Sequence, residues 1–358
     1  MTRMVDQAMR RAAASNVAAR KGAATMPLRD LASPSQVAVP SGAILVPEYP
    51  PVPELERGLK ITVLSGGASA EREVSLKSGR AVAASLTSLG HEVRLADITP
   101  GDLRALDQPM DMVFIALHGS FGEDGRLQRI LEERGIRYCG SGPEASAVAM
   151  DKVAAKRRFD AEGIPTPRFE VVTRTNAVDT LHRWVGPAVI KPVAEGSSVD
   201  CELADDRYTL IRRVGELTER YGRCLIEEYI RGPELTVGIL GEQALPPIDI
   251  RTKRRFYDYQ AKYVDDDTQY LFDIDLPPDV LAEVMTLSER ASGALGCRDF
   301  CRVDWMIDAA SCRPYVLEIN TIPGFTDHSL LPKAALRAGL SFPALCQRII
   351  ELSLQRDS

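Results

Sequence analysis

Four polar side chains near the end of the chain have the types and spacing of a surface that binds metal and phosphate. Arg302 and Asp304 are two residues apart, and so are Glu318 and Asn320. Two carboxylates and an amide oxygen are hard ligands that suit Mg²⁺, which keeps several waters and completes its octahedron with substrate phosphates. The alternative is a salt-bridged sheet face, in which Arg302 pairs with Asp304 or Glu318 and nothing is bound.

Two alternating stretches are expected to bring these groups together. Residues 300–307 and 315–320 alternate polar and apolar side chains, as strands with two unlike faces do. The four polar groups would therefore share one face of a hairpin, with Val303, Trp305, Leu317 and Ile319 on the other. Residues 321–329 follow with a Pro-Gly turn and several hydroxyls, which favours a binding loop over core.

Composition limits the class of protein. The 358 residues suffice for two or three domains, and 45% hydrophobic with 26% charged residues is ordinary for a soluble globular protein. A net charge of -6 argues against a general nucleic-acid binder, and the apolar runs are too short to span a membrane. Seven scattered cysteines without CxxC spacing indicate neither a zinc ribbon nor a disulfide framework, so a reducing cytosol is expected.

Residues 1–58 are expected to form a disordered leader and a Pro-rich linker. Met1–Arg29 is rich in Ala and Arg, and an amphipathic helix is compatible with Met4–Ala19. Ser33–Pro53 contains many prolines, which prevent regular structure. Acid-poor, Arg-rich leaders also occur as organelle transit peptides. We favour a tail without a role over that alternative.

An α/β unit with an open sheet is predicted for residues 59–151. Its strands and first helix are expected at 60–64, 91–97, 112–117 and about 74–89. The Gly-rich loop 65–71 leads into that helix, where free backbone N–H groups favour an anion. The loop lacks the GxGxxG spacing of a dinucleotide site.

Ligands of such sheets bind beyond the carboxyl ends of the strands. His118, in the glycine-dense loop after the third strand, is therefore either a ligand to a substrate group or a side chain that caps a helix. Gly135–Gly142 is expected to form a short fourth strand and turn. A helix that carries Lys152 and Lys156 should follow at about Ala145–Phe159.

A second unit, about 152–233, places groups suited to a nucleotide at the ends of strands. The strand 187–192 carries Lys191 and runs into residues 195–198, Glu-Gly-Ser-Ser, which can fold over phosphates with backbone and hydroxyl donors. A strand at 224–230 precedes Glu234, which would either hold a ribose or be a solvated edge charge.

Taken in order, these features resemble the ATP-grasp enzymes and, among them, the D-alanine:D-alanine ligases. The resemblance extends from about Lys60 to Leu354. The motifs that carry it in register are Gly66-Gly-Ala-Ser-Ala-Glu-Arg-Glu-Val-Ser-Leu76, Leu117-His-Gly with Gly122-Glu-Asp-Gly125, Gly140-Ser-Gly142 with Met150-Asp-Lys152, Glu195-Gly-Ser-Ser-Val199, Tyr257-Asp-Tyr-Gln-Ala-Lys-Tyr263, and Arg302-Val-Asp304 through Ser329-Leu330. It implies an ATP-grasp fold of three α/β domains, the first with an open parallel sheet, at 59–151, 152–233 and 234–355, with a lid loop at 251–271.

The resemblance implies that ATP lies between the second and third domains. The residues it assigns are Lys152, Lys191 and Lys262 for the phosphates, Glu227, Glu228, Tyr229 and Ile230 for the adenine, and Glu234 for the ribose. Asp304, Glu318 and Asn320 would bind two Mg²⁺ ions, or Mn²⁺, as the electrostatic clamp that phosphoryl transfer needs.

The implied reaction joins two D-alanines through an acyl phosphate of the first, which the amine of the second attacks. Arg302 and the Gly324 N–H would hold the tetrahedral oxyanion. The assigned substrate contacts are Glu71 for the first ammonium, His118 beside the first substrate, and Ser329 and Leu330 for the second carboxylate.

Residues 256–271 are polar and Asp-rich, as in a surface loop; the resemblance makes them a lid that excludes water from the acyl phosphate. As a lid residue, Tyr263 would join Glu71 and Ser197 in a hydrogen-bond network. The resemblance also places the difference from ester-forming relatives at this position, and a tyrosine favours amide formation.

Three residues depart from the family pattern. Asp200 stands where glycine is frequent, and aspartate tolerates left-handed backbone. Asp299 and Cys301 replace small residues just before Arg302. The extra carboxylate would either perturb the adjacent site or face water.

The expected protein is thus a cytoplasmic ATP-dependent ligase that makes D-alanyl-D-alanine for peptidoglycan. D-Alanine and ATP are the expected substrates of a homodimer without nucleic-acid or membrane partners. The alternatives are ligation to D-lactate or D-serine, and a catalytically silent ATP-binding regulatory protein. Intact Arg302, Asp304 and Ser197 argue against the silent protein.

Overall fold

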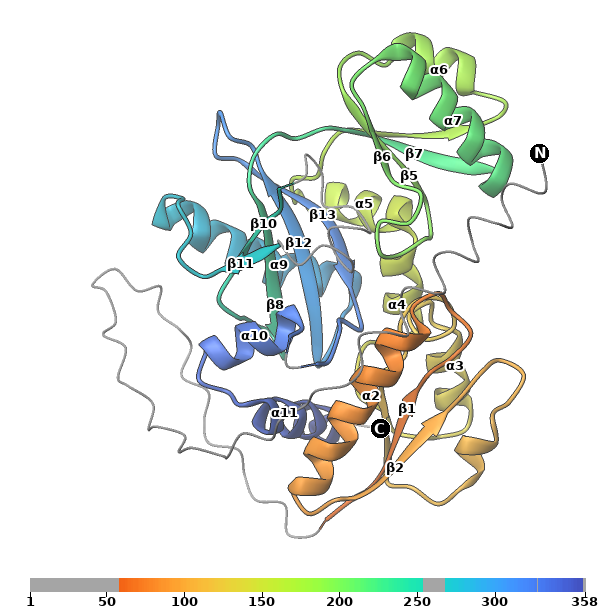
Figure 1. Ribbon diagram of the computed structural model, residues 1–358, viewed down its shortest axis with the longest axis vertical. Helices are drawn as coiled ribbons and strands as arrows, with labels where there is room; N and C mark the ends of the chain where they lie inside the picture. Colours follow the sequence, from red (N-terminus) through yellow and green to blue (C-terminus); the bar gives the residue numbers. More distant parts are fainter. Residues whose placement is uncertain (1–57, 254–267, 327, 357–358) are drawn as a thin grey trace, which may run out of the picture. The chain divides into compact units, whose positions relative to one another are not determined.

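Three β-sheets organise the chain, as Figure 1 shows for a computed structural model that describes residues 58–253, 268–326 and 328–356. The predictions for residues 1–57 and for Lys262 and Tyr263 lie outside those ranges. The described residues belong to one compact unit. The division into domains at 151/152 and 233/234 stays a prediction.

The first sheet is parallel, as predicted, with the strand order β2-β1-β3. β1 is buried at every residue after Lys60, because both of its faces are covered. α2 packs on β1 and β2 and, on its other side, on α11. The elements of this part are β1 (Lys60–Ser65), α2 (Arg72–Ser88), β2 (Glu92–Asp97), η1 (Arg104–Asp107), β3 (Met112–Ile115) and α3 (Arg126–Glu133).

The second sheet is antiparallel, with the order β4-β7-β5-β6, and α7 packs against it. Leu210, Val214 and Leu217 form the buried face of α7 and recur at helical spacing. The elements are β4 (Phe169–Thr173), α6 (Ala177–Arg183), β5 (Ala188–Pro192), β6 (Glu202–Ala204), α7 (Arg207–Tyr221) and β7 (Arg223–Glu228).

The third sheet is antiparallel in the order β11-β10-β8-β12-β13, and β9 pairs with β8. α9 covers the face that carries Val303 and Trp305, and the Trp305 Nε1 donates to Ser288 Oγ of α9 at 2.8 Å. The elements are β8 (Glu234–Leu240), β9 (Gln243–Ala244), β10 (Ile248–Arg251), β11 (Gln269–Leu271), α9 (Pro278–Leu295), β12 (Phe300–Ile307), β13 (Pro314–Asn320), α10 (Leu330–Arg337) and α11 (Phe342–Gln355).

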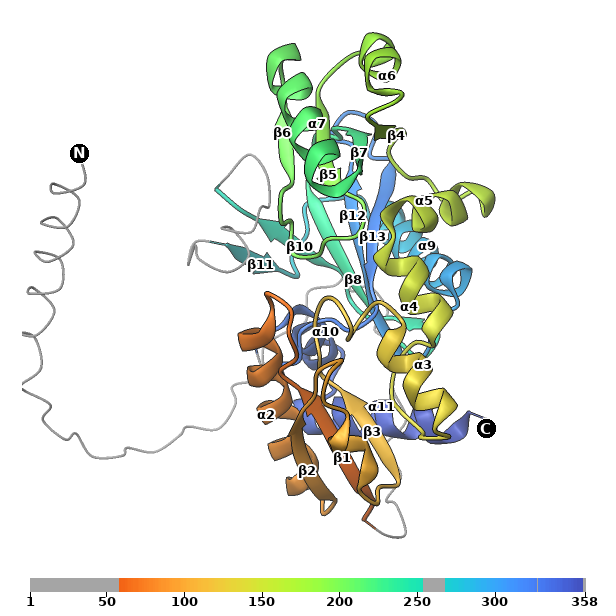
Figure 2. The ribbon, with the colours of Figure 1, turned by 90° about the vertical axis from the view of Figure 1, so that its right-hand side faces the viewer.

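The single helix predicted at 145–159 is two helices, α4 (Pro143–Met150) and α5 (Lys152–Ala161), which follow one another beside β13 in Figure 2. Asp151 separates them. Its backbone is extended, and its carboxylate accepts hydrogen bonds from the N–H groups of Val153 and Ala154. An aspartate that caps the second helix therefore ends the first.

The predicted strand in Gly135–Gly142 is also wrong. Tyr138 forms one isolated bridge to Val113. The chain then turns into Pro143, which begins α4 because its fixed backbone suits the first helical turn.

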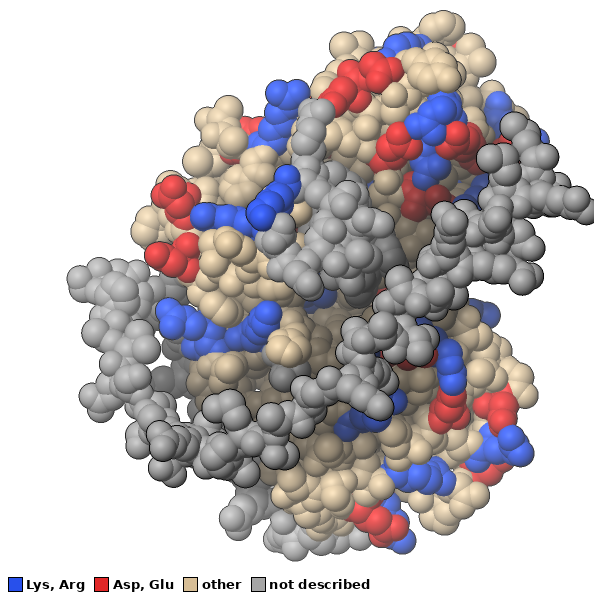
Figure 3. All heavy atoms as spheres, viewed as in Figure 1, with Lys and Arg blue, Asp and Glu red and all other residues tan. Residues whose placement is uncertain are grey.

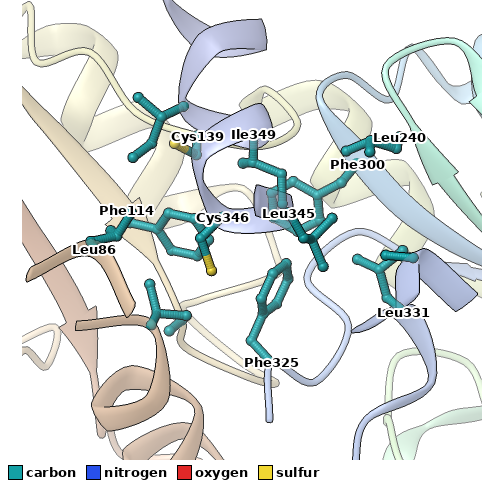
Figure 4. Close-up of a cluster of buried hydrophobic side chains, with 14 of the residues drawn as sticks. Leu86, Phe114, Cys139, Leu240, Phe300, Phe325, Leu331, Leu345, Cys346 and Ile349 are labelled. Carbon is teal, nitrogen blue, oxygen red and sulfur yellow. The ribbon is translucent and has the colours of Figure 1, made fainter. Parts of the chain in front are cut away.

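The first and third sheets share one apolar core, centred on three phenylalanines. Phe114 of β3, Phe300 of β12 and Phe325 after β13 are each at most 1% exposed. The Phe325 ring centroid lies 5.4 Å from that of Phe114 and 5.2 Å from that of Phe300, both in edge-on geometry. Figure 4 shows Phe325 between Leu86 and Phe114 on one side and Leu331 on the other. This packing fixes the start of the loop that carries Gly324 and Ser329.

We expect Phe325→Ala to lower the free energy of unfolding by about 3–5 kcal/mol, the usual cost of a large-to-small change in a filled core. Chemical denaturation followed by circular dichroism measures it. Tyr208→Ala is the matched control, because Tyr208 is 76% exposed and its loss should change stability by less than about 0.5 kcal/mol. Equal unfolding midpoints for the two variants would contradict the shared core.

Candidate functional site

Two adjoining cavities lie beside the polar face of the third sheet. The larger, of about 520 Å³, is lined by residues of the second and third sheets. The smaller, of about 340 Å³, is lined by the first unit, by β12 and β13, and by the loop after β13. Lys152, Ile250, Asp304 and Glu318 line both cavities. The two cavities therefore meet beside three charged side chains and one apolar one.

The predicted nucleotide-binding residues gather around the larger cavity. Those that line it are Lys152, Lys191, Glu227, Glu228, Tyr229, Ile230 and Glu234. Lys262 lies outside the described residues. The strand pairing explains the gathering, because β5 and β7 are neighbours and Lys191 pairs with Leu225, two residues before Glu227.

A buried carboxylate between two lysines forms the inner wall of this cavity. The Glu227 side chain is 3% exposed, and its two oxygens lie 2.6 Å from Lys156 Nζ and 3.0 Å from Lys191 Nζ. Burial by itself raises the pKa of Glu227, but the two ammonium groups outweigh it and lower that pKa. Two cations and one anion leave a net positive charge at the wall, which suits phosphate oxygens.

Lys156, which had no predicted role, lies behind this wall: it contacts Glu227 but is not among the residues that line the cavity. It is fully buried, and its Nζ also donates to Thr166 Oγ1 at 2.6 Å. Burial lowers the pKa of Lys156 to about 8, against the opposing effect of Glu227. Its spacing of four from Lys152 on one helix was the available signal, since such residues share a face.

The predicted hairpin brings its four polar groups together. Arg302 lies opposite Asn320, and Asp304 opposite Glu318, in the antiparallel register of β12 and β13. Leu317 was predicted to lie on the apolar face, opposite the four polar groups, and this prediction is wrong. A bulge after Asp304 shifts the register, and Leu317 lines the larger cavity.

The hairpin face contains ion pairs, as the salt-bridged alternative predicted, and it also borders open cavities. Arg302 donates to the two Asp304 oxygens, at 2.9 Å each, and Lys152 Nζ lies 3.3 Å from Glu318. Thr236 Oγ1 also donates to Asp304, at 2.6 Å. Over the described ranges, no cluster of three His, Cys, Asp or Glu residues has the arrangement of a metal site. Asp304 and Glu318 nevertheless border both cavities, and Asn320 borders the smaller one, so these oxygens are not sealed in the sheet.

The residues predicted to bind substrate and to assist catalysis gather around the smaller cavity. Those that line it are Glu71, His118, Ser197, Arg302, Asn320, Gly324, Ser329 and Leu330. Tyr263 lies outside the described residues. Ser197 Oγ donates to Glu71, so two loops from different sheets already meet.

Gly324 sits where a side chain would collide. A Cβ atom there would lie 2.8 Å from Ser329 Oγ, which also accepts a hydrogen bond from Thr326 N at 3.0 Å. Glycine therefore lets the Ser329 hydroxyl approach the backbone of residue 324.

His118 connects the loop after β13 to the first unit. Its Nδ1 donates to the Ile322 carbonyl at 3.0 Å, and its Nε2 lies 3.1 Å from Ser78 Oγ, which accepts from Phe325 N. The helix-capping alternative is wrong, because these contacts occupy both ring nitrogens. His118 is 5% exposed and lines the smaller cavity.

Asp299 and Cys301 line neither cavity. Of the two alternatives for Asp299, the one in which its carboxylate faces water is wrong. Asp299 is 5% exposed and accepts from Gly140 N and Ser353 Oγ, at 2.7 Å each. Cys301 is fully buried, with Sγ 3.4 Å from Ser292 Oγ on the α9 side of the sheet. The two residues therefore belong to the packing that supports β12.

On the face drawn in Figure 3, basic and acidic side chains are interspersed rather than separated by sign. None of the helices in the described ranges has both the length and the apolarity that a bilayer crossing requires.

The sequence matches two family patterns. The one described as "D-ala D-ala ligase C-terminus" covers residues 159–351, and "D-ala D-ala ligase N-terminus" covers 99–141. The chain is 46% identical over 302 residues to the D-alanine--D-alanine ligase of Gloeobacter violaceus. This alignment covers 83% of this chain and 100% of that relative.

Solved structures agree with these matches. The D-alanine--D-alanine ligase of Bacillus anthracis complexed with ATP is 34% identical, with a TM-score of 0.71 over 83% of this chain and 98% of that one. The VanG D-Ala:D-Ser ligase of Enterococcus faecalis is 27% identical, with a TM-score of 0.74 over 83% of this chain and 100% of that one. The predicted ATP-grasp fold is confirmed.

We expect Glu123→Gln to lower the pKa of His118. Burial alone lowers that pKa, but Glu123 Oε1, 3.6 Å away, and the nearby Glu71 outweigh burial and raise it above 6.5. Without the Glu123 charge the imidazolium loses its main support, so the ring should lose its proton at a lower pH. Titration of the histidine ring signals by NMR measures this. Glu133→Gln, in an exposed helix end, is the control, and an unchanged His118 titration in Glu123→Gln would refute the assignment.

Proposed function

Because the chain belongs to the D-alanine--D-alanine ligase family, we propose that it joins two D-alanines at the expense of ATP, for peptidoglycan synthesis. The relatives from Gloeobacter violaceus and Bacillus anthracis named above are ligases of this kind, and this family is ATP-dependent and ADP-forming. We further propose a cytoplasmic homodimer that uses Mg²⁺, or Mn²⁺, with ATP as co-substrate.

The observation that carries this proposal is the meeting of the two cavities at Lys152, Asp304 and Glu318. The predicted nucleotide residues line one side of that junction, and the predicted amino-acid residues line the other. Phosphoryl transfer from a nucleotide to a carboxylate requires the two substrates to be in line and close. A junction of cationic and carboxylate groups between two compartments provides that arrangement.

The oxygen donors at the junction fit a hard divalent cation. Asp304, Glu318 and Asn320 supply two carboxylates and an amide oxygen from facing positions of β12 and β13. A bound magnesium would supply charge neutralisation for the phosphates. Lys152 and Lys191 hold the phosphate oxygens beside them, and Glu227 keeps Lys191 in place through their 3.0 Å ion pair.

The smaller cavity holds the two amino acids. Glu71, oriented by Ser197, binds the ammonium of the first D-alanine, and His118 lies beside it. Arg302 and the Gly324 N–H stabilise the negative charge that develops when the second amine attacks the acyl phosphate. Ser329 and Leu330 bind the carboxylate of the second D-alanine.

Ligation of D-serine as the second substrate is the other candidate, because a D-Ala:D-Ser ligase is among the structural matches. D-Lactate ligation and a silent ATP-binding protein remain alternatives that the assay below distinguishes.

The test of function is phosphate release from ATP in the presence of Mg²⁺ and D-alanine. We expect release with D-alanine, formation of the dipeptide, and no release above background with L-alanine. Parallel assays that contain D-alanine together with D-serine or D-lactate show which compound the enzyme accepts as its second substrate. Tight ATP binding without phosphate release in any arm would support the silent protein.

We expect Asp304→Asn to lower kcat by at least about 100-fold, since a lost carboxylate at the metal removes several kcal/mol of charge stabilisation. Asp308→Asn is the matched control, because Asp308 lies in the turn of the same hairpin and contacts Ser311. The control should keep full turnover. Wild-type turnover in Asp304→Asn would remove Asp304 from the metal site.

A further inference from the structure

We propose that Asp200 is a positioning residue for the ligation reaction: it clamps the loop 195–201 to α7 so that Ser197 and Ser198 face the two cavities. The inference rests on the proposed function, because ligation is the activity that the loop serves. Asp200 also stands where the family pattern frequently has glycine, and the proposed reaction described above gives this residue no role.

The loop has a backbone that needs outside support. Ser197, Ser198 and Asp200 have φ angles of +52°, +55° and +57°, in the left-handed region that L residues rarely occupy. Such conformations persist only where surrounding contacts determine them. Two backbone hydrogen bonds lie within the loop, from Val199 N to Gly196 O at 3.0 Å and from Cys201 N to Ser198 O at 3.2 Å.

α7 provides several outside contacts, and Asp200 receives four hydrogen bonds from it. Arg213 Nη2 donates to the Asp200 carbonyl at 2.6 Å and to its Oδ1 at 3.0 Å. Arg220 Nη1 and Tyr221 Oη donate to Oδ2, at 2.8 Å and 2.6 Å. The helix is a firm support, since its Leu210, Val214 and Leu217 are buried against the second sheet.

The titration of these groups agrees with the geometry. Donation from Tyr221 is the largest cause of a lowered pKa at Asp200. Burial and the Asp200 carboxylate raise the pKa of Tyr221 to about 12, so the phenol keeps the proton that it donates.

The other end of the loop is held at the site itself. Lys152 Nζ donates to the Glu195 carbonyl at 2.7 Å, and Ser197 Oγ donates to Glu71. Gly196 and Ser197 line the smaller cavity, whereas Ser198 and Cys201 line the larger one. The loop is thus a wall of both compartments, and Asp200 fixes its distal end.

A simpler explanation is that aspartate is merely tolerated in a left-handed turn. Three substitutions separate the two explanations. Asp200→Gly relieves the backbone and removes the side-chain bonds of the clamp. Asp200→Asn keeps the side-chain shape and one acceptor oxygen. Asp200→Ala removes the same side-chain bonds and also tolerates the left-handed backbone less well. In all three variants, only the Arg213 bond to the backbone carbonyl of residue 200 is independent of the side chain. Asp206→Ala is the matched control, since Asp206 caps the far end of α7 through Thr209 N and does not touch the loop.

The first measurement is amide hydrogen exchange of Val199 and Cys201 in the full-length chain. We expect faster exchange in Asp200→Ala and Asp200→Gly, a smaller increase in Asp200→Asn, and wild-type exchange in Asp206→Ala. Wild-type exchange in Asp200→Gly would overturn the clamp, because glycine satisfies the backbone alone. This readout does not depend on ligase activity, so it also decides the clamp if the proposed function fails.

The second measurement separates kcat from KM. A loop that misplaces Ser197 should lower kcat for dipeptide formation by about 10- to 100-fold in Asp200→Ala and Asp200→Gly, with KM for ATP changed far less. Asp200→Asn should recover part of kcat, and Tyr221→Phe should show a smaller loss. If the loss of kcat instead follows the fall in melting temperature, with Asp206→Ala on the same line, Asp200 is merely structural and the proposal is wrong. Absence of D-alanine-dependent phosphate release in the wild type would instead refute the proposed function.

Discussion

The candidate site depends on one register, the pairing of Asp304 with Glu318 across β12 and β13. This pairing places two carboxylates side by side where the two cavities meet. Among the described residues, Lys152 and Ile250 are the others that line both cavities. A shift by one residue would turn the carboxylates of one strand into the α9 core. Buried Val303 and Trp305 oppose that shift, since they would have to leave their apolar contacts.

Cations balance these carboxylates from several directions. Arg302 holds Asp304, Lys152 approaches Glu318, and Glu227 is enclosed by Lys156 and Lys191. Such pairs cost desolvation energy, so they are poor devices for stability alone. At the edge of two cavities, they instead hold charged groups ready for a polyanionic substrate, which can compete for Lys152 and Lys191.

Local patterns predicted the strands of the site well. Period-two alternation gave β12 to the residue and β13 to within one residue, because one face of each strand packs on α9. The bulge at Leu317, the break at Asp151 and the missing strand near Tyr138 were not predictable in this way. Each depends on a contact made elsewhere in the chain or on one capping side chain. The roles of Lys156 and Asp200 also appeared only when α5 and α7 were placed beside the cavities, because their partners are distant in sequence or buried.

The most direct test of the central claim is a crystal structure with Mn²⁺ and a non-hydrolysable ATP analogue, in which anomalous scattering locates the metal. We predict manganese bound by Asp304, Glu318 and Asn320, with the triphosphate in the larger cavity pointing toward the smaller one. Manganese bound elsewhere, or an Arg302–Asp304 pair that stays closed with no metal beside it, would contradict the account.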